Sequence, residues 1–360
     1  MNTSNGAPTC EAAHALFICG PSRSGTALMR SILNLHSQVH LAAETHYFDD
    51  LRAALRNKAE ASLDDAERRR CEDYFLSLGH RPYGHRGDPD AGRHTREQLR
   101  QLADSLGVGA DAYFEAFCRL EATHEGKPRF GEKTPRHIFR IPEILARYPR
   151  AKIMCMIRDP RAVIVSYRDW KNQGGFDFEN DPGHKEELER DHERARQSYN
   201  LLLMSMLWRS TVKAAERALR DFGPERIRLQ KYEDLARAPR QNLTAICEWL
   251  DLPFEPGMLE APMSNSSFSK YEERNGVSTE SIDRWRKKLS AVEIGMIQAV
   301  CRKPMERMGY ERDAVATPWL RLLGSWVALP FAVIRAARLN RSRIGNLPSY
   351  VWRRFKLAVS

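Results

Sequence analysis

The feature that most constrains this chain is a glycine-bounded loop between a short apolar run and a helical pattern. Residues 15–19 (ALFIC) are apolar, and the run ends at the loop 20–26 (GPSRSGT). Apolar residues then recur at helical spacing over 28–35. We interpret this segment as strand, loop and helix. Because such a loop directs backbone N–H groups and the positive end of a helix dipole at its ligand, it predicts an anion site.

Three further apolar runs predict strands, at 39–43, 152–157 and 227–232. A helical pattern near 142–148 precedes the second of them. Strands that alternate with helices indicate a parallel sheet, because parallel strands need crossover connections. We therefore predict an α/β, P-loop-like three-layer fold with a central parallel sheet flanked by helices. Ligands of such sheets bind at the carboxyl ends of the strands.

We expect this fold to fill residues 15–312, between a flexible N-terminus at 1–14 and a basic, partly apolar C-terminal tail at 313–360. Two charged stretches, about 51–125 and 171–208, are predicted as helical insertions into the sheet domain. With 42% apolar and 9% aromatic residues, the chain can bury a sizeable core, which excludes a disordered protein.

The positive charge of the chain is concentrated in its tail. Lys and Arg total 57 against 47 Asp and Glu, a formal net charge of +10. Eight of these basic residues, and no acid, lie between 318 and 360. A basic balance favours anionic partners. Since the rest of the chain is nearly balanced and does not interleave basic with aromatic residues, we expect no nucleic-acid partner.

The tail contains an uncharged run of 13 residues, 322–334, between Arg321 and Arg335. As a helix this run reaches about 20 Å, which is short of a hydrocarbon core of about 30 Å. Its composition fits two alternatives. One is peripheral contact of residues 319–356 with an anionic membrane. The other is a helix packed on the domain or on a partner subunit.

The cysteines predict a reducing location. The seven cysteines form no Cys-x-x-Cys pair, and several lie in apolar runs, which is typical of reduced, buried thiols in a cytosolic protein. The N-terminal segment has no basic stretch followed by an apolar one, so we expect neither secretion nor an N-terminal anchor. The expected location is cytoplasmic, at the cytoplasmic face of a membrane if the tail binds lipid.

The loop 20–26 keeps the glycine spacing of nucleotide-triphosphate P-loops but not their other side chains. Thr26 stands where those loops have lysine, and Ala27 stands where they have the Mg²⁺-binding hydroxyl. Without these groups γ-phosphoryl transfer loses two of its parts, whereas an adenylate-type phosphate with a sulfuryl group needs no metal. The histidines within 80–94 fit no metal-ligand spacing, so no metal is expected. An ordinary tight turn is the alternative for this loop alone.

A second candidate anion site follows the strand at 152–157. Arg158 lies at the strand end, and Asp159 with Pro160 suits the cap and first turn of a helix. Ser166 lies about two turns into that helix. A guanidinium and a hydroxyl that converge in this way can hold a second phosphate. Taken alone, an arginine at a strand end is more often a surface ion-pair partner.

Four motifs, in this order, resemble those of the PAPS-dependent sulfotransferases, among them the tyrosylprotein-type and bacterial enzymes. They are GPSRSGT at 20–26, GEKTPRH at 131–137, IRDPRAVIVSYR at 157–168 and KYEDL at 231–235. PAPS (3′-phosphoadenosine 5′-phosphosulfate) carries two separate anionic groups, which matches two separate phosphate motifs. The resemblance covers residues 16–310. It implies transfer of a sulfuryl group from PAPS to a hydroxyl or amine acceptor, with PAP as the product and without a metal.

The resemblance also implies which residues bind the cofactor. They are Arg23, Ser24, Gly25, Thr26, Ala27, Arg158, Ser166, Tyr232, Arg284 and Lys287. Those of the first loop and its helix would bind the 5′-phosphosulfate, and Arg158 with Ser166 would bind the 3′-phosphate. Tyr232 would line the nucleotide, while Arg284 and Lys287 would belong to a late loop that closes over it.

Catalytic roles follow from the same resemblance. Glu44, in a Glu-Thr pair, resembles the general base of an in-line displacement, and Lys133 and Arg23 resemble residues that contact the transferring group. An attacking hydroxyl must lose its proton, so a carboxylate or an imidazole is needed within hydrogen-bond reach. His46 is the competing base, and Glu132 is interpreted as an orienting or structural partner of Lys133.

Three functions remain open. The leading one is an enzyme, a PAPS-dependent sulfotransferase. The alternatives are a P-loop nucleotide kinase or NTPase and a non-catalytic PAP-binding protein. The acceptor has no signature of its own, so a glycan, a lipid-linked glycan, a small molecule and a peptide tyrosine all fit, and the tail favours a glycan or a lipid. The sequence predicts no oligomeric state.

Overall fold

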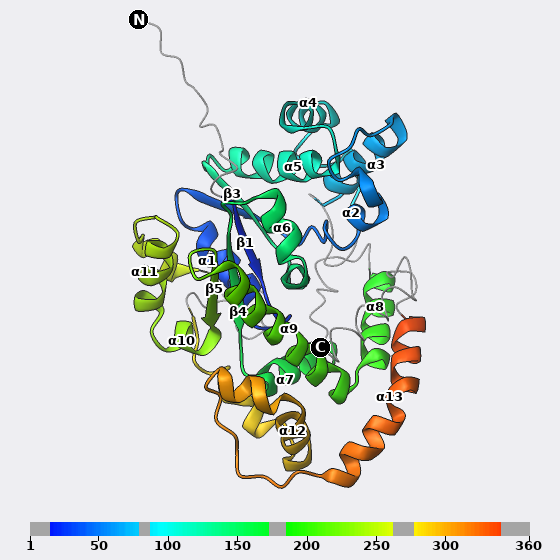
Figure 1. The fold of residues 1–360 in the computed structure, drawn as a ribbon, viewed down its shortest axis with the longest axis vertical. Coiled ribbons are helices and arrows are strands. Elements are labelled where there is room, and N and C mark those ends of the chain that lie inside the picture. Colours follow the sequence, from blue (N-terminus) through cyan, green and yellow to red (C-terminus); the bar gives the residue numbers. More distant parts are fainter. Residues whose placement is uncertain (1–14, 79–86, 173–184, 262–276, 340–360) are drawn as a thin grey trace, which may run out of the picture.

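A five-stranded, all-parallel sheet forms the centre of the molecule (Figure 1). The computed structural model describes residues 15–78, 87–172, 185–261 and 277–339. The strand order is β2-β3-β1-β4-β5. The strands are β1 (Leu16–Cys19), β2 (Val39–Ala42), β3 (Arg129–Lys133), β4 (Lys152–Ile157) and β5 (Ile227–Lys231).

The sheet contains the four predicted strands and a fifth, β3, which the sequence pattern does not predict. The sequence of β3, RFGEK, has no apolar run, so hydrophobic periodicity gives no signal there. Gly131 pairs with Leu16 of β1, and a Cβ at this glycine would lie 2.1 Å from the Leu16 carbonyl oxygen. Only glycine therefore allows the close approach of these two strands.

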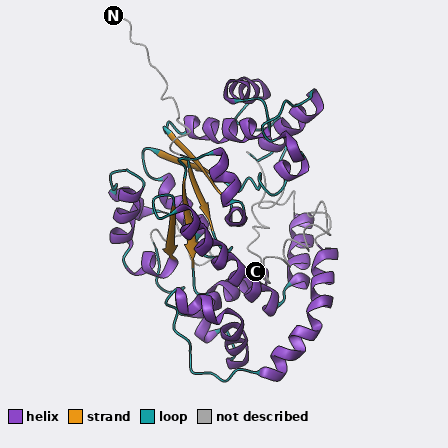
Figure 2. Cartoon of the chain, viewed as in Figure 1, coloured by secondary structure: helices purple, strands orange, loops and turns teal. Residues whose placement is uncertain are grey.

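Helices cover both faces of the sheet, as Figure 2 shows in purple around the orange strands. The α-helices of the described residues are α1 (Thr26–Asn34), α2 (Leu51–Ala54), α3 (Asp65–Leu76), α4 (Arg96–Leu106), α5 (Ala110–His124), α6 (Ile141–Arg147), α7 (Pro160–Asn172), α8 (Lys185–Ser198), α9 (Leu201–Phe222), α10 (Tyr232–Arg237), α11 (Pro239–Trp249), α12 (Ala291–Arg307) and α13 (Trp319–Leu339). Capping boxes on Asp64, Thr95 and Ser290 begin α3, α4 and α12.

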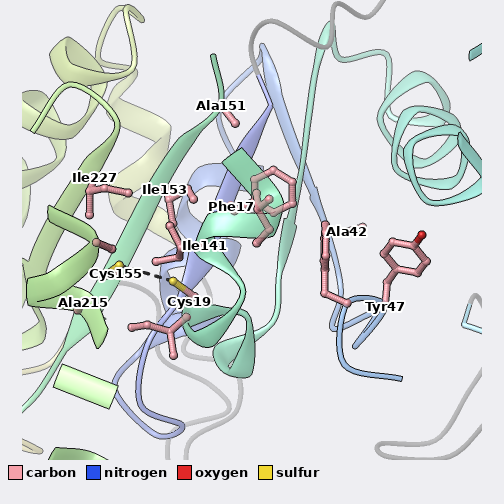
Figure 3. Packing of buried hydrophobic residues seen from close by; sticks show 14 of the residues in the cluster. Phe17, Cys19, Ala42, Tyr47, Ile141, Ala151, Ile153, Cys155, Ala215 and Ile227 are labelled. Atoms are coloured by element: carbon pink, nitrogen blue, oxygen red, sulfur yellow. Dashed lines mark hydrogen bonds between the residues drawn. The ribbon is translucent and has the colours of Figure 1, made fainter. Parts of the chain in front are cut away.

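Alternate residues of β1 enter two separate cores. Phe17 and Cys19 join the larger core, which includes buried residues of α5, α6 and α9 and is shown in part in Figure 3. Leu16 and Ile18 join the core beneath α1 and α11. Because successive side chains of a strand point to opposite faces, both faces of the sheet are apolar and covered. The predicted α/β fold with three layers is confirmed.

The two predicted insertions are helical where they are described. The first contains α2 to α5, of which α5 packs on β2 and β3; in Figure 1 these helices lie together at the top of the view. The second contains α8 and the beginning of α9. Residues 1–14, predicted to be flexible, and 340–360 of the tail lie outside the described residues. The domain boundaries therefore stay a prediction.

The uncharged run of the tail is the middle of a longer helix. α13 has 21 residues and is about 31 Å long. The expected length of about 20 Å is correct for the uncharged run and wrong for the helix that contains it. By length and composition α13 is apolar enough to cross a membrane, with 11% of its most apolar window buried. It packs on α8 and α9. The apolar pattern extends past Arg321 and Arg335. A helix length read from the uncharged run alone is therefore too short.

Candidate active site

The loop 20–26 lies between β1 and α1 in a backbone conformation that needs its two glycines. Gly20 and Gly25 have φ values of 137° and 87°. A Cβ would lie 2.2 Å from the Met156 carbonyl oxygen at Gly20, and 2.7 Å from the Tyr232 ring at Gly25. Arg23 also has a positive φ, 72°. The loop is therefore pressed against β4 and the start of α10, where no larger residue fits without strain.

The loop and the first turn of α1 present unsatisfied donors. Ser24 is fully buried, and its Oγ has no hydrogen-bond partner among the described residues. Thr26 and Ala27 are the first residues of α1, which begins without a side-chain cap and without an acid in its first turn. Buried polar atoms are normally paired. A buried, unpaired hydroxyl at a helix N-terminus therefore fits a phosphate or sulfuryl oxygen.

Arg158 and Ser166 lie beside this loop. β1 and β4 are neighbours in the sheet, so the segments that follow them meet at one edge. The Arg158 guanidinium donates to the Arg23 carbonyl oxygen at 3.2 Å, and Arg23 Nε donates to Ser166 Oγ at 3.1 Å. Arg158 Nε is buried without a hydrogen-bond partner among the described residues. The two predicted anion motifs thus form one continuous group of donors.

Tyr232 joins a late segment of the chain to the same group. The Arg158 guanidinium lies over the Tyr232 ring, 4.3 Å from its centroid, a cation–π geometry. The Tyr232 hydroxyl is 2.6 Å from Ser281 Oγ, and Arg158 donates to the Ser281 carbonyl oxygen at 2.7 Å. Ser281 was not predicted, because a serine in an irregular segment gives no sequence signal. Arg284 and Lys287 lie just beyond it in the short 3-10 helix Arg284–Lys287, and their role stays a prediction.

Glu44 and Lys133 form an ion pair at the exits of β2 and β3. These strands are neighbours, with Ala42 opposite Glu132, so the residues that follow them meet. Lys133 Nζ donates to Glu44 Oε1, and His46 Nε2 lies 3.3 Å from Glu44 Oε2. The side chains of Glu44 and Lys133 are 22% and 6% exposed.

The surroundings of Glu44 keep it ionised. Burial raises the pKa of this carboxyl, but the charges and hydrogen bonds of Lys133 and His46 more than offset that effect. The pKa of Glu44 is therefore held well below its ordinary value. A carboxylate that is ionised at neutral pH can accept a proton, which a general base must do.

Behind this pair, Glu132 holds the two strand exits together. Its buried carboxylate accepts hydrogen bonds from the Thr45 N–H at 2.8 Å, from the Thr45 hydroxyl at 3.1 Å and from His137 Nδ1 at 3.0 Å. The Thr134 hydroxyl also donates to it. Burial raises the pKa of Glu132, while His137 and these hydrogen bonds lower it overall. Glu132 thus has the contacts of an orienting partner for the residues beside it, Glu44 and Lys133.

The ligand chemistry of this edge is that of an anion site. Within the described ranges, no group of three or more His, Cys, Asp or Glu side chains is arranged to hold a metal ion. The groups around the loop are a hydroxyl without a partner, two guanidinium groups, backbone N–H groups and an ammonium. Gly20 N–H donates to the Pro135 carbonyl oxygen at 3.1 Å, which joins the loop to the β3 exit. A nucleotide with two anionic groups would fit these residues.

Comparisons with known proteins agree with this geometry. Residues 15–256 match the family model described as "Sulfotransferase family". A protein-tyrosine sulfotransferase of Drosophila melanogaster is 23% identical over 283 residues, covering 75% of this chain and 46% of the relative. Human carbohydrate sulfotransferase 3 is 28% identical over 194 residues, covering 48% of this chain and 37% of the relative. The chain thus spans less than half the length of these two relatives.

A solved structure has a similar fold. The sulfotransferase domain from the curacin biosynthetic pathway aligns with a TM-score of 0.51 at 19% sequence identity. The alignment covers 83% of this chain and 98% of that domain. At this identity the likeness concerns the fold, a parallel sheet between two layers of helices.

Proposed function

Because this chain belongs to the sulfotransferase family, we propose that it transfers a sulfuryl group from PAPS to a hydroxyl or amine of an acceptor. One observation carries the proposal. The loop 20–26 and the second motif form a single group of donors, joined by the 3.1 Å hydrogen bond from Arg23 to Ser166. Two anion sites at this spacing suit the two ends of one nucleotide.

The residues divide between these two ends. Ser24, Thr26 and the backbone N–H groups of the loop would hold the 5′-phosphosulfate, which supplies the activated sulfuryl group. Arg158 and Ser166 would hold the 3′-phosphate, since a guanidinium is well shaped for phosphate. Arg23 lies between the two groups and contacts both Ser166 and, through its carbonyl oxygen, Arg158.

Glu44 is the general base of the proposed reaction. It would take the proton of the acceptor hydroxyl as the oxygen–sulfur bond forms and the bond from sulfur to the nucleotide phosphate breaks. Lys133 keeps Glu44 ionised. Any interaction that draws the Lys133 ammonium away would raise the pKa of Glu44 and make it a stronger base. Lys133 and Arg23 would stabilise the negative charge that develops on the transferring group.

His46 is the alternative base. Its Nε2 already contacts Glu44, while its Nδ1 is buried without a hydrogen-bond partner among the described residues. A ring held by Glu44 in this way is better suited to orient the carboxylate than to replace it. We therefore assign the base to Glu44.

The acceptor we propose is a hydroxyl on a glycan or on a lipid-linked glycan. The relatives include a carbohydrate sulfotransferase and a protein-tyrosine sulfotransferase, so a peptide tyrosine is the second candidate. Both classes present a hydroxyl, which is the group that the Glu44 mechanism requires. Screening labelled PAPS against cell extracts and envelope fractions would identify the class.

We also propose an intracellular, reducing location. The described cysteines are buried and form no disulfide with one another: Cys19, Cys71, Cys118, Cys155, Cys247 and Cys301. Cys19 Sγ and Cys155 Sγ lie 3.6 Å apart as thiols (Figure 3), and burial raises the pKa of Cys19. Isolation of the protein under non-reducing conditions, followed by counting its free thiols, would test this location. A Cys19–Cys155 disulfide in that preparation would contradict it.

Calorimetric titration separates the proposed function from its alternatives. A sulfotransferase binds PAP tightly in the presence of EDTA, and a P-loop kinase or NTPase prefers ATP with Mg²⁺. The account predicts tight, metal-independent PAP binding together with turnover of labelled PAPS. A preference for ATP with Mg²⁺ would make the chain a kinase or NTPase, and PAP binding without turnover on any acceptor fraction would make it a non-catalytic sensor.

A further inference from the structure

Helix α13 has an exposed apolar face that sulfuryl transfer does not use. Five large apolar side chains recur along it every three or four residues and are 48 to 88% exposed. We call them the α13 stripe: Leu320, Leu323, Val327, Phe331 and Ile334. Trp319 and Trp326 are also exposed on this helix, at 71% and 42%. A contiguous apolar face of this kind marks an interaction site.

The other side of α13 is held by the domain. Leu322, Ala332 and Ala337 are buried, and α13 packs on α8 and α9. In Figure 1 the orange helix lies alongside α8 at the margin of the molecule, away from the sheet. The helix is therefore fixed along one side, and the stripe faces outward from it.

The charge carried by α13 itself has one sign. α13 carries Arg321, Arg335 and Arg338, all exposed, and contains no acid. From residue 314 to the end of the chain there are eight basic residues and no acidic one. Apolar side chains beside arginines match a surface that is apolar below and negative above, which is the outer part of an anionic lipid leaflet. Tryptophan also prefers that boundary.

We propose that α13 docks in the plane of an anionic membrane, with the stripe at the boundary between headgroups and acyl chains and the arginines at the phosphates. A spanning orientation fits less well, although 21 residues are long enough. It would pull Leu322 and Ala332 off the domain. It would also bring Arg321 or Arg335, which are about 21 Å apart along the helix, into the hydrocarbon.

Vesicle flotation with the full-length protein tests the proposal. We expect it to float with phosphatidylcholine vesicles that contain about one third phosphatidylglycerol, and much less with pure phosphatidylcholine. Raising the salt concentration should weaken the first interaction, because it screens the attraction between arginine and phosphate. Protein that stays at the bottom with both kinds of vesicle would overturn the proposal.

Two variants identify the surface. The triple variant Leu323→Ser, Val327→Ser and Phe331→Ser should lower binding to the anionic vesicles about tenfold or more, because it removes the apolar contact. Its control is Val108→Ser with Val292→Ser, which removes two exposed apolar side chains that lie outside α13. That control should bind like the wild type.

The charges are tested in the same way. Arg335→Glu with Arg338→Glu should abolish the preference for anionic vesicles. Arg217→Glu with Lys303→Glu changes the net charge equally on exposed positions of α9 and α12 and should keep the preference. All variants should retain PAP affinity, which shows that they are folded and keeps this test separate from sulfuryl transfer.

Two results would show that the stripe does not dock on a membrane. If the triple variant binds vesicles as the wild type does, the stripe is not the docking surface. If the wild type is a dimer in solution, does not float, and becomes a monomer on the triple substitution, the stripe binds a second copy of this chain. Either result would contradict membrane docking through the stripe.

Discussion

The active-site edge consists of two halves: the first has donors without partners in the described part of the chain, and the second has carboxylates that are already paired. The anion-binding half, the loop 20–26 with Arg158, Ser166 and Tyr232, contains a buried hydroxyl and a guanidinium N–H without partners among the described residues. In the catalytic half, Glu44 and Glu132 both already have cationic or hydrogen-bonding partners. In our proposal the ligand supplies the missing partners of the first half, whereas in the second half the charges of Glu44 and Glu132 are paired within the protein. Substitutions in the two halves should therefore separate affinity from turnover.

Glu44→Gln should have the largest effect of the catalytic half. Removal of the proposed general base should lower kcat about 10²-fold or more. The affinity for PAP should change little, because Glu44 does not belong to the anion-binding half. Turnover of labelled PAPS with an acceptor fraction and calorimetry with PAP measure the two quantities on the same preparation.

His46→Gln is the matched comparison for that experiment. It should lower kcat by less than about tenfold, since it removes an orienting contact and leaves the base. The opposite order, a small effect at Glu44 and a large one at His46, would assign the base to His46.

Glu132→Gln should have an intermediate effect, with kcat about tenfold lower and both KM for PAPS and PAP affinity unchanged. The amide cannot accept the hydrogen bonds of Thr45, Thr134 and His137 as the carboxylate does. The segments that carry Glu44 and Lys133 are then no longer held at a fixed distance from each other. The control is Glu115→Gln on α5, a buried carboxylate that pairs with Arg119 and Arg147. If both variants lower kcat equally, Glu132 affects only stability and does not position the pair.

The smallest predicted effect is on the pH dependence of stability. The pKa of Glu44 is lower in the folded protein than its ordinary value of 4.5, so the folded state binds fewer protons here than the unfolded state. This contribution to stability is present above pH 4.5 and is lost as the pH falls below it. Lys133→Met removes the main cause of the shift.

Melting temperatures of the wild type and of Lys133→Met between pH 7 and pH 3 measure this contribution. Glu132 and Asp49, whose pKa values are also lowered, remain in both proteins and form a common background. The fall in Tm on acidification should be smaller in the variant, by roughly 3 °C. An equal fall in both proteins would mean that Lys133 does not hold the pKa of Glu44 down.

The anion-binding half could be predicted well from the sequence. Its residues lie in short segments directly after the apolar runs of β1, β4 and β5, where glycine, arginine and hydroxyl side chains mark the loops. In the structure Arg158 meets the loop 20–26 through a 3.2 Å hydrogen bond to the Arg23 carbonyl oxygen. The parallel sheet explains why these segments meet, because the carboxyl ends of neighbouring parallel strands lie at the same edge of the sheet.

Other features of the fold and the site depend on contacts between distant segments, which the local sequence pattern does not reveal. β3 has no apolar run, and the hydrogen bonds of Glu132 and the contact of Ser281 with Tyr232 join segments far apart in the chain. The exposure of the α13 stripe is of the same kind, since an apolar helix has one composition whether it is buried or not. These features follow from tertiary packing.

The central claim is that the two motifs hold opposite ends of one nucleotide. The ratio of the affinities for PAP and AMP tests it most directly. The wild type should bind PAP about 30-fold or more tightly than AMP, because we propose that Arg158 and Ser166 contact the 3′-phosphate, which AMP lacks. In Arg158→Ala the two affinities should become nearly equal, with AMP bound about as well as by the wild type. A variant that weakens PAP and AMP by the same factor, or a wild type that does not distinguish them, would contradict the account.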